Sequence, residues 1–285
     1  MRFSIITPSF NPSPWLPLCI ASVADQAVDV EHIVQDAGST DGTLDWLRND
    51  RRVKTFIERD SGMYDAVNRG LHRAEGDILA YLNCDEQYLP GCLPTVEAFF
   101  HAYPAVEVVF GDVVVVNSHL EYCLHRKVQV PSRYHTWVSH LSTLTCATFF
   151  RRTILNRHGI LFDARLRDVG DAEWMLRLLE RRVPMAVLRQ FTSVFTMTGE
   201  NMSAKPNAIR ETKELRRSAP LVARTLKPVL ILHHRLRRLA GGIYSQQPFS
   251  FSIYTHASPD QRVSFEVTRP RFRWHGMENL RSDGR

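Results

Sequence analysis

The chain has 285 residues and a formal net charge of +6, with 44% hydrophobic and 23% charged residues, as is ordinary for a soluble globular protein. Its length suits one large domain, or one domain with an appendage. No apolar run approaches the ~20 residues of a membrane-spanning helix, and the five cysteines form no CxxC pair. These features argue against a membrane-spanning protein, a disulfide scaffold and a zinc site, and we expect reduced thiols and a cytoplasmic location.

The first third of the chain alternates apolar runs with helical patterns. Strands are predicted at residues 3–9, 31–37, 53–60 and 77–86, and helices between them at 15–26, 43–50 and 63–76. The N-terminal residues therefore predict a first strand rather than a signal peptide. Strand, helix and strand in repetition indicate a parallel sheet with helices on both faces.

The middle of the chain continues the α/β pattern. Residues 106–117 are rich in β-branched side chains and predict a strand. The second half of residues 162–182 predicts an amphipathic helix. From Tyr244 onward the sequence alternates like two or three antiparallel strands, so we expect a β-hairpin folded back on the domain. The side chains that we expect to be buried there are Phe265, Phe272 and Trp274.

Polar loops follow the predicted strands, where open parallel sheets bind their ligands. The loop "DAGSTDGT" after the second strand consists of small residues that let backbone approach a ligand. Asp36 can accept hydrogen bonds from a base or a ribose hydroxyl, so the loop favours the nucleoside half of a nucleotide. The alternative is a structural turn in which Thr40 or Asp41 caps the next helix.

The loop "NCDEQ" after the fourth strand carries two adjacent acids, Asp85 and Glu86. Such hard oxygen ligands suit Mg²⁺ or Mn²⁺ bridging a diphosphate. A divalent ion there would neutralise the charge that builds on a departing diphosphate. The alternative is an exposed acidic turn.

Five motifs in order carry a resemblance to a known family: "TPSFN", "DAGSTDGT", "SGMYDAVNRGLHRAEGD", "YLNCDE" and "GDAEWMLRL". Over roughly residues 1–200 the chain resembles the inverting, family-2 nucleotide-sugar glycosyltransferases, above all bacterial enzymes of exopolysaccharide or lipopolysaccharide assembly. The resemblance implies a GT-A fold, a Rossmann-like, mixed and mainly parallel α/β sheet flanked by helices. It also implies metal-assisted sugar transfer, with inversion, from a nucleotide-diphosphate sugar to a glycan or lipid-linked glycan.

The same resemblance implies roles for individual residues. The nucleoside would be held by Thr7, Pro8, Ser9 and Asp36. The nucleotide or sugar would be lined by Asp60 and Asn68, with Asn83 and Cys84 beside the donor. Asp85 would bind the metal. Asn83 stands where many members carry a first Asp, and Glu86 replaces a common second Asp, which leaves Asp85 as the one secure ligand.

Inverting transfer needs one base to take the proton of the acceptor hydroxyl. The resemblance places that base in the acidic motif opening the late helix, and we select Asp171, with Asp168 and Glu173 as rivals. The alternative is a helix N-cap formed by Asp171 or Asp168. For the whole chain, the alternative to an enzyme is a catalytically weak protein that binds a nucleotide sugar or a glycan.

Ten Lys or Arg stand against Glu211 and Glu214 between Lys205 and Arg238, a local balance of +8. One interpretation is peripheral contact with anionic lipid at the inner face of the plasma membrane. The other is a solvated helix whose apolar side packs on the catalytic domain. Pro228 predicts a kink or break, and the absence of a recognisable nucleic-acid-binding motif argues against nucleic acid.

We expect three segments along the chain. Residues 1–204 would form the GT-A catalytic domain, with a nucleotide-binding half at 1–110 and an acceptor half at 111–204. Residues 205–242 would form the basic helical segment, and residues 243–285 a β-rich extension.

Overall fold

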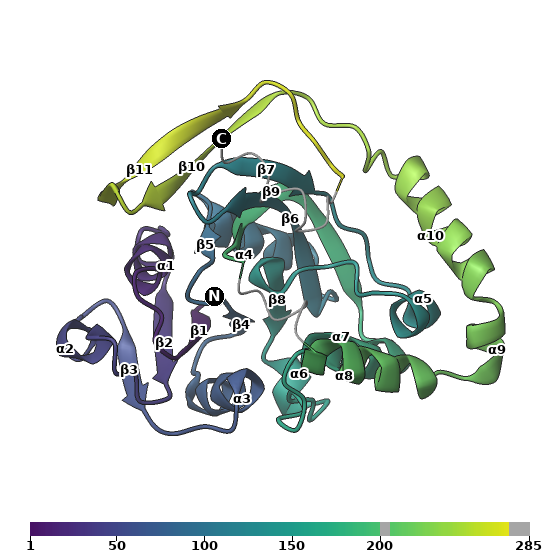
Figure 1. Ribbon diagram of the computed structural model, residues 1–285, viewed down its shortest axis with the longest axis horizontal. Coiled ribbons are helices and arrows are strands. Elements are labelled where there is room, and N and C mark those ends of the chain that lie inside the picture. The colour runs from purple at the N-terminus through teal and green to yellow at the C-terminus, as the bar shows by residue number, and fades with distance from the viewer. Residues whose placement is uncertain (200–205, 274–285) are drawn as a thin grey trace.

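A computed structural model describes residues 1–199 and 206–273 of the chain (Figure 1). Within these ranges, nine strands form one sheet in the order β3-β2-β1-β4-β8-β6-β9-β5, and β7 pairs with β6. Helices cover the sheet, and a two-stranded hairpin and a helical arm follow it in the chain (Figure 1). None of the helices in the described ranges is both long and apolar enough to cross a membrane.

The N-terminal half forms the parallel part of the sheet. Its strands are β1 (Phe3–Ser9), β2 (Val30–Asp36), β3 (Lys54–Ile57) and β4 (Ile78–Tyr81), and its helices are α1 (Leu16–Ala24), α2 (Thr43–Leu47) and α3 (Met63–Arg73). β1 is central and pairs in parallel with both β2 and β4, while β3 extends the sheet beside β2. The predicted strand and helix order is confirmed, since strands buried on both faces carry the apolar runs that a parallel sheet requires.

The second half makes the sheet mixed. Its elements are β5 (Gln87–Tyr88), α4 (Cys92–Ala102), β6 (Val108–Asn117), β7 (Tyr122–Arg126), α5 (Arg133–Val138), a 3₁₀ turn (Thr145–Ala147), β8 (Thr148–Arg151), α6 (Thr153–Asn156), α7 (Gly170–Glu180) and β9 (Met185–Met197). β8 lies antiparallel between β4 and β6, and β9 runs parallel to β6. One apolar cluster contains Phe3 and Ile5 of β1, and another contains Ile6 of the same strand, as expected where side chains alternate between the two faces.

The basic segment forms three helices, α8 (Pro206–Arg217), α9 (Leu221–Thr225) and α10 (Lys227–Ala240). The predicted break at Pro228 is confirmed, because α9 ends at Thr225 and Pro228 lies in the first turn of α10, where its missing amide costs nothing. The division of the chain at residues 204 and 242 stays a prediction.

The C-terminal residues form a hairpin of β10 (Phe249–Thr255) and β11 (Ser258–Val267). Phe265 stacks on Phe251, with ring centroids 5.3 Å apart, and Phe272 contacts Tyr244 at 5.1 Å. The predicted burial of Trp274 falls outside the described residues.

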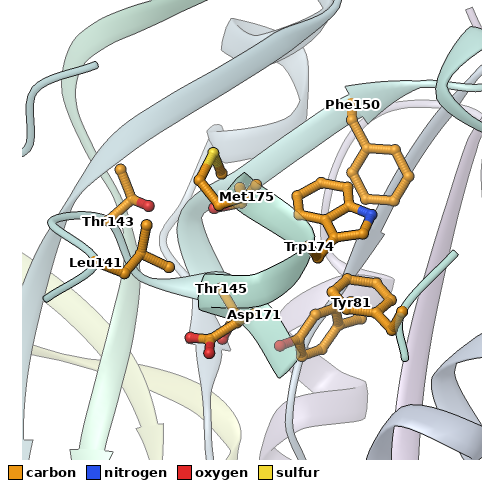
Figure 2. A pocket seen from close by; sticks show the side chains of 10 residues that line it. Tyr81, Leu141, Thr143, Thr145, Phe150, Asp171, Trp174 and Met175 are labelled. Atoms are coloured by element: carbon orange, nitrogen blue, oxygen red, sulfur yellow. The ribbon is translucent and has the colours of Figure 1, made fainter. Parts of the chain in front are cut away.

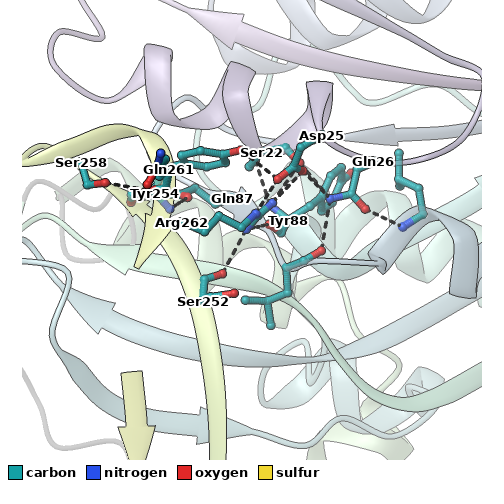
Figure 3. Close-up of polar contacts among 12 residues, drawn as sticks. Ser22, Asp25, Gln26, Gln87, Tyr88, Ser252, Tyr254, Ser258, Gln261 and Arg262 are labelled. Atoms are coloured by element: carbon teal, nitrogen blue, oxygen red, sulfur yellow. Dashed lines mark hydrogen bonds and ion pairs between the residues drawn. The ribbon is translucent and has the colours of Figure 1, made fainter. Parts of the chain in front are cut away.

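One arginine of β11 fastens the hairpin to α1 and β5 (Figure 3). The guanidinium of Arg262 donates to both carboxylate oxygens of Asp25, at 2.5 and 2.9 Å, and to the carbonyl oxygens of Tyr88 and Ser252, each at 3.0 Å. Tyr254 Oη donates to the same Asp25 carboxylate at 2.9 Å. The hairpin is therefore held by charge-assisted hydrogen bonds as well as by apolar contact.

Arg262→Ala should lower the free energy of unfolding by about 2–3 kcal/mol, because it leaves Asp25 without its cation. Chemical denaturation followed by circular dichroism measures this change. Arg269→Ala removes an exposed charge from the end of the hairpin and should change stability by less than about 0.5 kcal/mol. Equal effects of the two substitutions would contradict the assigned role of Arg262.

Candidate active site at the carboxyl edge of the sheet

Parallel pairing brings the ends of β1 and β2 together, because Ser9 lies opposite Asp36 in the register. Asp36 is fully buried. Its carboxylate accepts hydrogen bonds from the hydroxyls of Ser9 and Ser39, at 2.6 and 2.7 Å, and from the amides of Gly38 and Ser39, at 2.9 and 2.7 Å. Asp36 therefore fixes the shape of the loop that follows β2.

Further contacts join the loops after β1 and β2. The side chain of Asn11 accepts the amide of Thr40 at 2.8 Å, and Asp41 accepts the amides of Ser13 and Thr43 at 3.0 and 3.1 Å. Asp41 thus holds the amide of the first residue of α2, but the predicted alternative that Thr40 or Asp41 caps this helix is wrong, because its N-cap is Gly42 and no side chain caps it.

The residues predicted to hold a nucleoside at the end of β1 are buried. Thr7 turns its hydroxyl into the core, 2.8 Å from Nε2 of His32. Pro8 and Ser9 are also buried, and Ser9 is bound to Asp36. Contacts of Thr7, Pro8, Ser9 and Asp36 with a nucleoside stay a prediction.

The segment around α3 places Asp60 and Asn68 differently. Asp60 accepts the amide of Gly62 at 2.9 Å, and burial raises the pKa of its carboxyl, with the charges of Asp65 and Asp36 adding to the effect. The amide of Asn68 is engaged with the backbone of Phe162, donating to its oxygen at 2.8 Å and accepting from its nitrogen at 3.0 Å. Asn68 thus holds the loop before α7 onto α3, and its predicted contact with the donor is untested.

The loop after β4 contains a pair of acids with no counter-charge. Asp85 has no ion-pair partner among the described residues, and burial raises its pKa to about 6. Glu86 is 1% exposed, and burial together with the charge of Asp85 raises its pKa to about 8. Glu86 Oε2 accepts the amide of Asn83 at 2.9 Å, but Oε1 has no hydrogen-bond partner in the described part of the chain. Two carboxyl groups with an unpaired buried oxygen fit the donor set of a divalent cation.

Cys84 lies beside these acids, and its thiol is half buried against the apolar cluster of Leu16, Ile20, Val34 and Leu47. Burial raises the pKa of this thiol, so it stays protonated. The predicted donor contacts of Asn83 and Cys84 are untested.

Asp171 lies in the first turn of α7 and lines a small pocket together with Tyr81 at the end of β4 (Figure 2). Burial raises the pKa of its carboxyl. The backbone amide of Asp171 donates to Tyr64 Oη at 3.1 Å, and that hydroxyl lies 3.5 Å from Asp171 Oδ1. The chain passes close to Tyr64 only because residue 170 is glycine, since a Cβ there would lie 2.6 Å from the Tyr64 ring.

The two rival bases are engaged elsewhere. Glu173 forms an ion pair with Arg177 at 2.7 Å, and Asp168 accepts a hydrogen bond from Asn207 at 2.5 Å. The predicted alternative that Asp171 or Asp168 forms the N-cap is wrong, because the N-cap of α7 is Val169 and no side chain caps it. These contacts leave Asp171 as the acid of this motif that faces the pocket.

Two residues that the sequence analysis did not select hold the loop before Asp171 in place. One is Tyr64. The other is Glu211 of α8, whose buried carboxylate accepts the amides of Arg167, Asp168 and Val169 at 2.9–3.2 Å. Tyr64 stands inside a recognised motif, which was a usable signal, whereas nothing local marks Glu211 among the surrounding cations.

The arrangement of the sheet matches solved glycosyltransferase structures. S. aureus TarS 1–349 in complex with UDP-GlcNAc superposes with a TM-score of 0.60 at 19% identity, over 84% of this chain and 73% of that chain. The predicted GT-A fold is confirmed by this likeness.

The sequence model of glycosyl transferase family 2 matches residues 4–159, more than half of the chain. The chain therefore belongs to glycosyl transferase family 2, and the predicted family is confirmed. A PGL/p-HBAD biosynthesis glycosyltransferase of Mycobacterium bovis is 28% identical over 82% of this chain and 90% of its own length. A Campylobacter jejuni GalNAc(5)-diNAcBac-PP-undecaprenol beta-1,3-glucosyltransferase is 32% identical over 40% of this chain and 38% of its own length.

Proposed function

We propose that the protein transfers a sugar, with inversion, from a nucleotide-diphosphate sugar to a glycan or lipid-linked glycan of the bacterial cell envelope. The observation that carries this proposal is the position of Asp171, a half-buried carboxylate beside the pocket at the carboxyl edge of the sheet. The names of the similar proteins support the donor and the acceptor class, since they specify UDP-GlcNAc in one case and an undecaprenyl diphosphate-linked glycan in another.

In this proposal Asp171 takes the proton of the acceptor hydroxyl as the new glycosidic bond forms on the face opposite the leaving nucleotide. The amide of Ala172 donates to Asp171 Oδ1 at 2.8 Å and favours the charged form, which counteracts the effect of burial. Tyr64 orients the residue from behind through its hydroxyl. Without turnover the chain would be a binding protein, which the release of nucleoside diphosphate distinguishes from an enzyme.

Asp171→Asn should lower kcat by about 10²–10⁴-fold, the usual contribution of a general base, and leave the affinity for the donor within about twofold. Steady-state assay of nucleoside diphosphate release and calorimetric titration with the donor measure the two quantities. Glu173→Gln is the matched control and should keep most of the activity, because Glu173 is paired with Arg177. Full turnover by Asp171→Asn would remove this residue from the role.

Asp85 would hold a divalent cation, Mg²⁺ or Mn²⁺, beside the diphosphate of the donor, and such an ion supplies positive charge to the leaving group. In the metal-free protein the raised pKa values of Asp85 and Glu86 have a consequence for stability. Between about pH 4 and pH 8 the folded chain binds more protons at these two groups than the unfolded chain, so their contribution to stability falls as the pH rises.

The melting temperature of metal-free wild type relative to that of Glu86→Gln should therefore fall from pH 5 to pH 8. This comparison cancels the contribution of the buried histidines, whose lowered pKa values make stability rise with pH over part of the same range. Mn²⁺ should raise the melting temperature more at pH 8, where the acids are ionised, than at pH 5. Differential scanning calorimetry measures both effects. Asp85→Asn should abolish the response to Mn²⁺, and a response that persists in this variant would place the cation elsewhere.

The basic segment supports peripheral contact with an anionic membrane. Leu230 and His234 face the body of the protein, and the His234 ring stacks on His135 with centroids 3.7 Å apart. The row on the outer side of α10 is apolar yet exposed, with Val229 at 59%, Leu232 at 57%, Leu236 at 55% and Leu239 at 65%. The interpretation in which the apolar side packs on the catalytic domain is thus wrong for this row. Exposed leucines among arginines favour the interface of an anionic bilayer.

The double substitution Leu232→Glu/Leu236→Glu should lower the affinity for phosphatidylglycerol vesicles at least ~10-fold, because two apolar side chains no longer enter the lipid. Vesicle co-sedimentation measures the affinity, and the melting temperature should stay unchanged since both residues are exposed. Tyr103→Glu introduces a charge at a residue 54% exposed at the end of α4 and should not affect binding. Unaltered sedimentation of the double variant would argue that α10 does not face lipid.

A further inference from the structure

A hollow of about 710 Å³ lies between α5, α8, α9 and the beginning of α10. Five of the residues that line it are cations, namely Lys213, Arg216, Arg217, Arg224 and Lys227. None of the described residues that line it is acidic or aromatic. We call this feature the basic hollow.

The positive charge of the basic hollow is not neutralised within the described part of the chain. Arg216 donates to the carbonyl oxygen of Ser139 at 2.6 Å. Lys213, Arg217, Arg224 and Lys227 form no ion pair or side-chain hydrogen bond with any described residue. Cations gathered around one concavity repel one another, so a multivalent anion bound there would be strongly favoured.

Exposed apolar side chains occur in the lining of the basic hollow and on α9, the helix that supplies Arg224 to this lining. Ile209, which lines the hollow, is 64% exposed, and the next helix begins with Leu221 and Val222, each 67% exposed. These residues belong to the same helical arm as the exposed leucine row of α10. A ligand that fits these surroundings carries a compact anionic head and an apolar chain, as a membrane lipid does.

Helix α8 lies between the basic hollow and the loop that precedes Asp171. Asn207 and Glu211 lie one helical turn apart and bind the loop at residues 167–169. Thr212 and Arg216 lie on the opposite side of α8 and line the hollow. The basic hollow and the loop at residues 167–169 are therefore separated by one helix diameter, about 10 Å.

We propose that the basic hollow binds the diphosphate of a lipid-linked acceptor, with the lipid chain leaving along α9 and α10 and the glycan directed toward Asp171. This assignment rests on the proposed function. An arginine side chain can donate two parallel hydrogen bonds to one phosphate group. The volume of the basic hollow falls within the usual range of ligand sites. The lack of an aromatic residue in the lining disfavours a nucleotide base, which would need a stacking surface.

The test compares binding of the full-length protein to two kinds of phosphatidylcholine vesicles that carry different anionic lipids. One kind contains a synthetic long-chain prenyl diphosphate, and the other contains phosphatidylglycerol at the same surface charge. Wild-type protein should prefer the diphosphate vesicles by about 25-fold, as expected if each of two phosphate-paired cations adds about fivefold. Arg217→Ala and Arg224→Ala should each reduce this preference to about fivefold.

Arg235→Ala is the matched control, because it removes an equally exposed charge from α10 outside the hollow. It should lower binding to both vesicles alike and leave the preference unchanged. Equal binding of wild type to the two vesicles, or a preference that stays at the wild-type value in both Arg217→Ala and Arg224→Ala, would overturn the proposal. Soluble pyrophosphate that binds as tightly as the vesicles would also overturn it, by showing a site for free phosphate anions.

Donor binding and donor hydrolysis without acceptor are measured on the same variants. Both should match wild type if only the acceptor site is altered. Wild-type protein that neither binds nor hydrolyses the donor would refute the proposed function. The vesicle preference would then still decide the role of the basic hollow.

Discussion

Parallel pairing of β1 with both β2 and β4 is the constraint on which the candidate site depends. Strands that run the same way end at the same edge, so the loops after Ser9, Asp36 and Tyr81 meet there, and hydrogen bonds such as that of Ser9 to Asp36 then join the first two loops. The second half of the sheet adds Asp171 to this edge, because the pocket beside Tyr81 also contacts the first turn of α7. The chemistry can therefore be distributed over distant stretches of sequence and still assemble.

The acids at this edge of the sheet differ in how far hydrogen bonds and cations of the protein compensate their negative charge. Asp36 is satisfied by four hydrogen bonds from its own loop and its neighbour β1. Asp85 forms no ion pair with any described residue, and Glu86 accepts the amide of Asn83 on only one of its two oxygens. A buried acid whose oxygens are all bound shapes a loop, whereas an acid with an unbound oxygen and no counter-charge favours the arrival of a cation. In the basic hollow, cations without a partner among the described residues favour the arrival of an anion in the same way.

The sequence predicted the elements of the N-terminal half well, because their signals are local. Apolar runs, turn residues and the alternation of strand with helix are sufficient for β1 to β4 and for α7. The motifs also mark Asp85 and Asp171 as candidate site residues. The contacts of each predicted donor-binding side chain cannot be predicted from such patterns. The side-chain amide of Asn68, for example, is hydrogen-bonded to the backbone of Phe162.

Long-range contacts lay beyond such patterns. Glu211 supports amides some 40 residues earlier, and no periodicity in a cationic helix marks one glutamate as buried. The orientation of α10 also could not be predicted from the sequence, because periodicity identifies an apolar side of a helix but not whether protein or solvent faces it. Here a histidine turns inward and leucines turn outward, the reverse of the usual rule for a helix on a globular domain.

The buried carboxylate of Glu211 has one more consequence, for where the working unit ends. The family match stops at residue 159 and the sheet ends with β9 at Met197, yet three amides just ahead of Asp171 find their acceptor only in α8. A protein trimmed after the sheet would keep every recognised motif and lose the hydrogen bonds that hold the loop before Asp171. Helix α8 is thus a structural part of the candidate site, whatever else the basic segment binds.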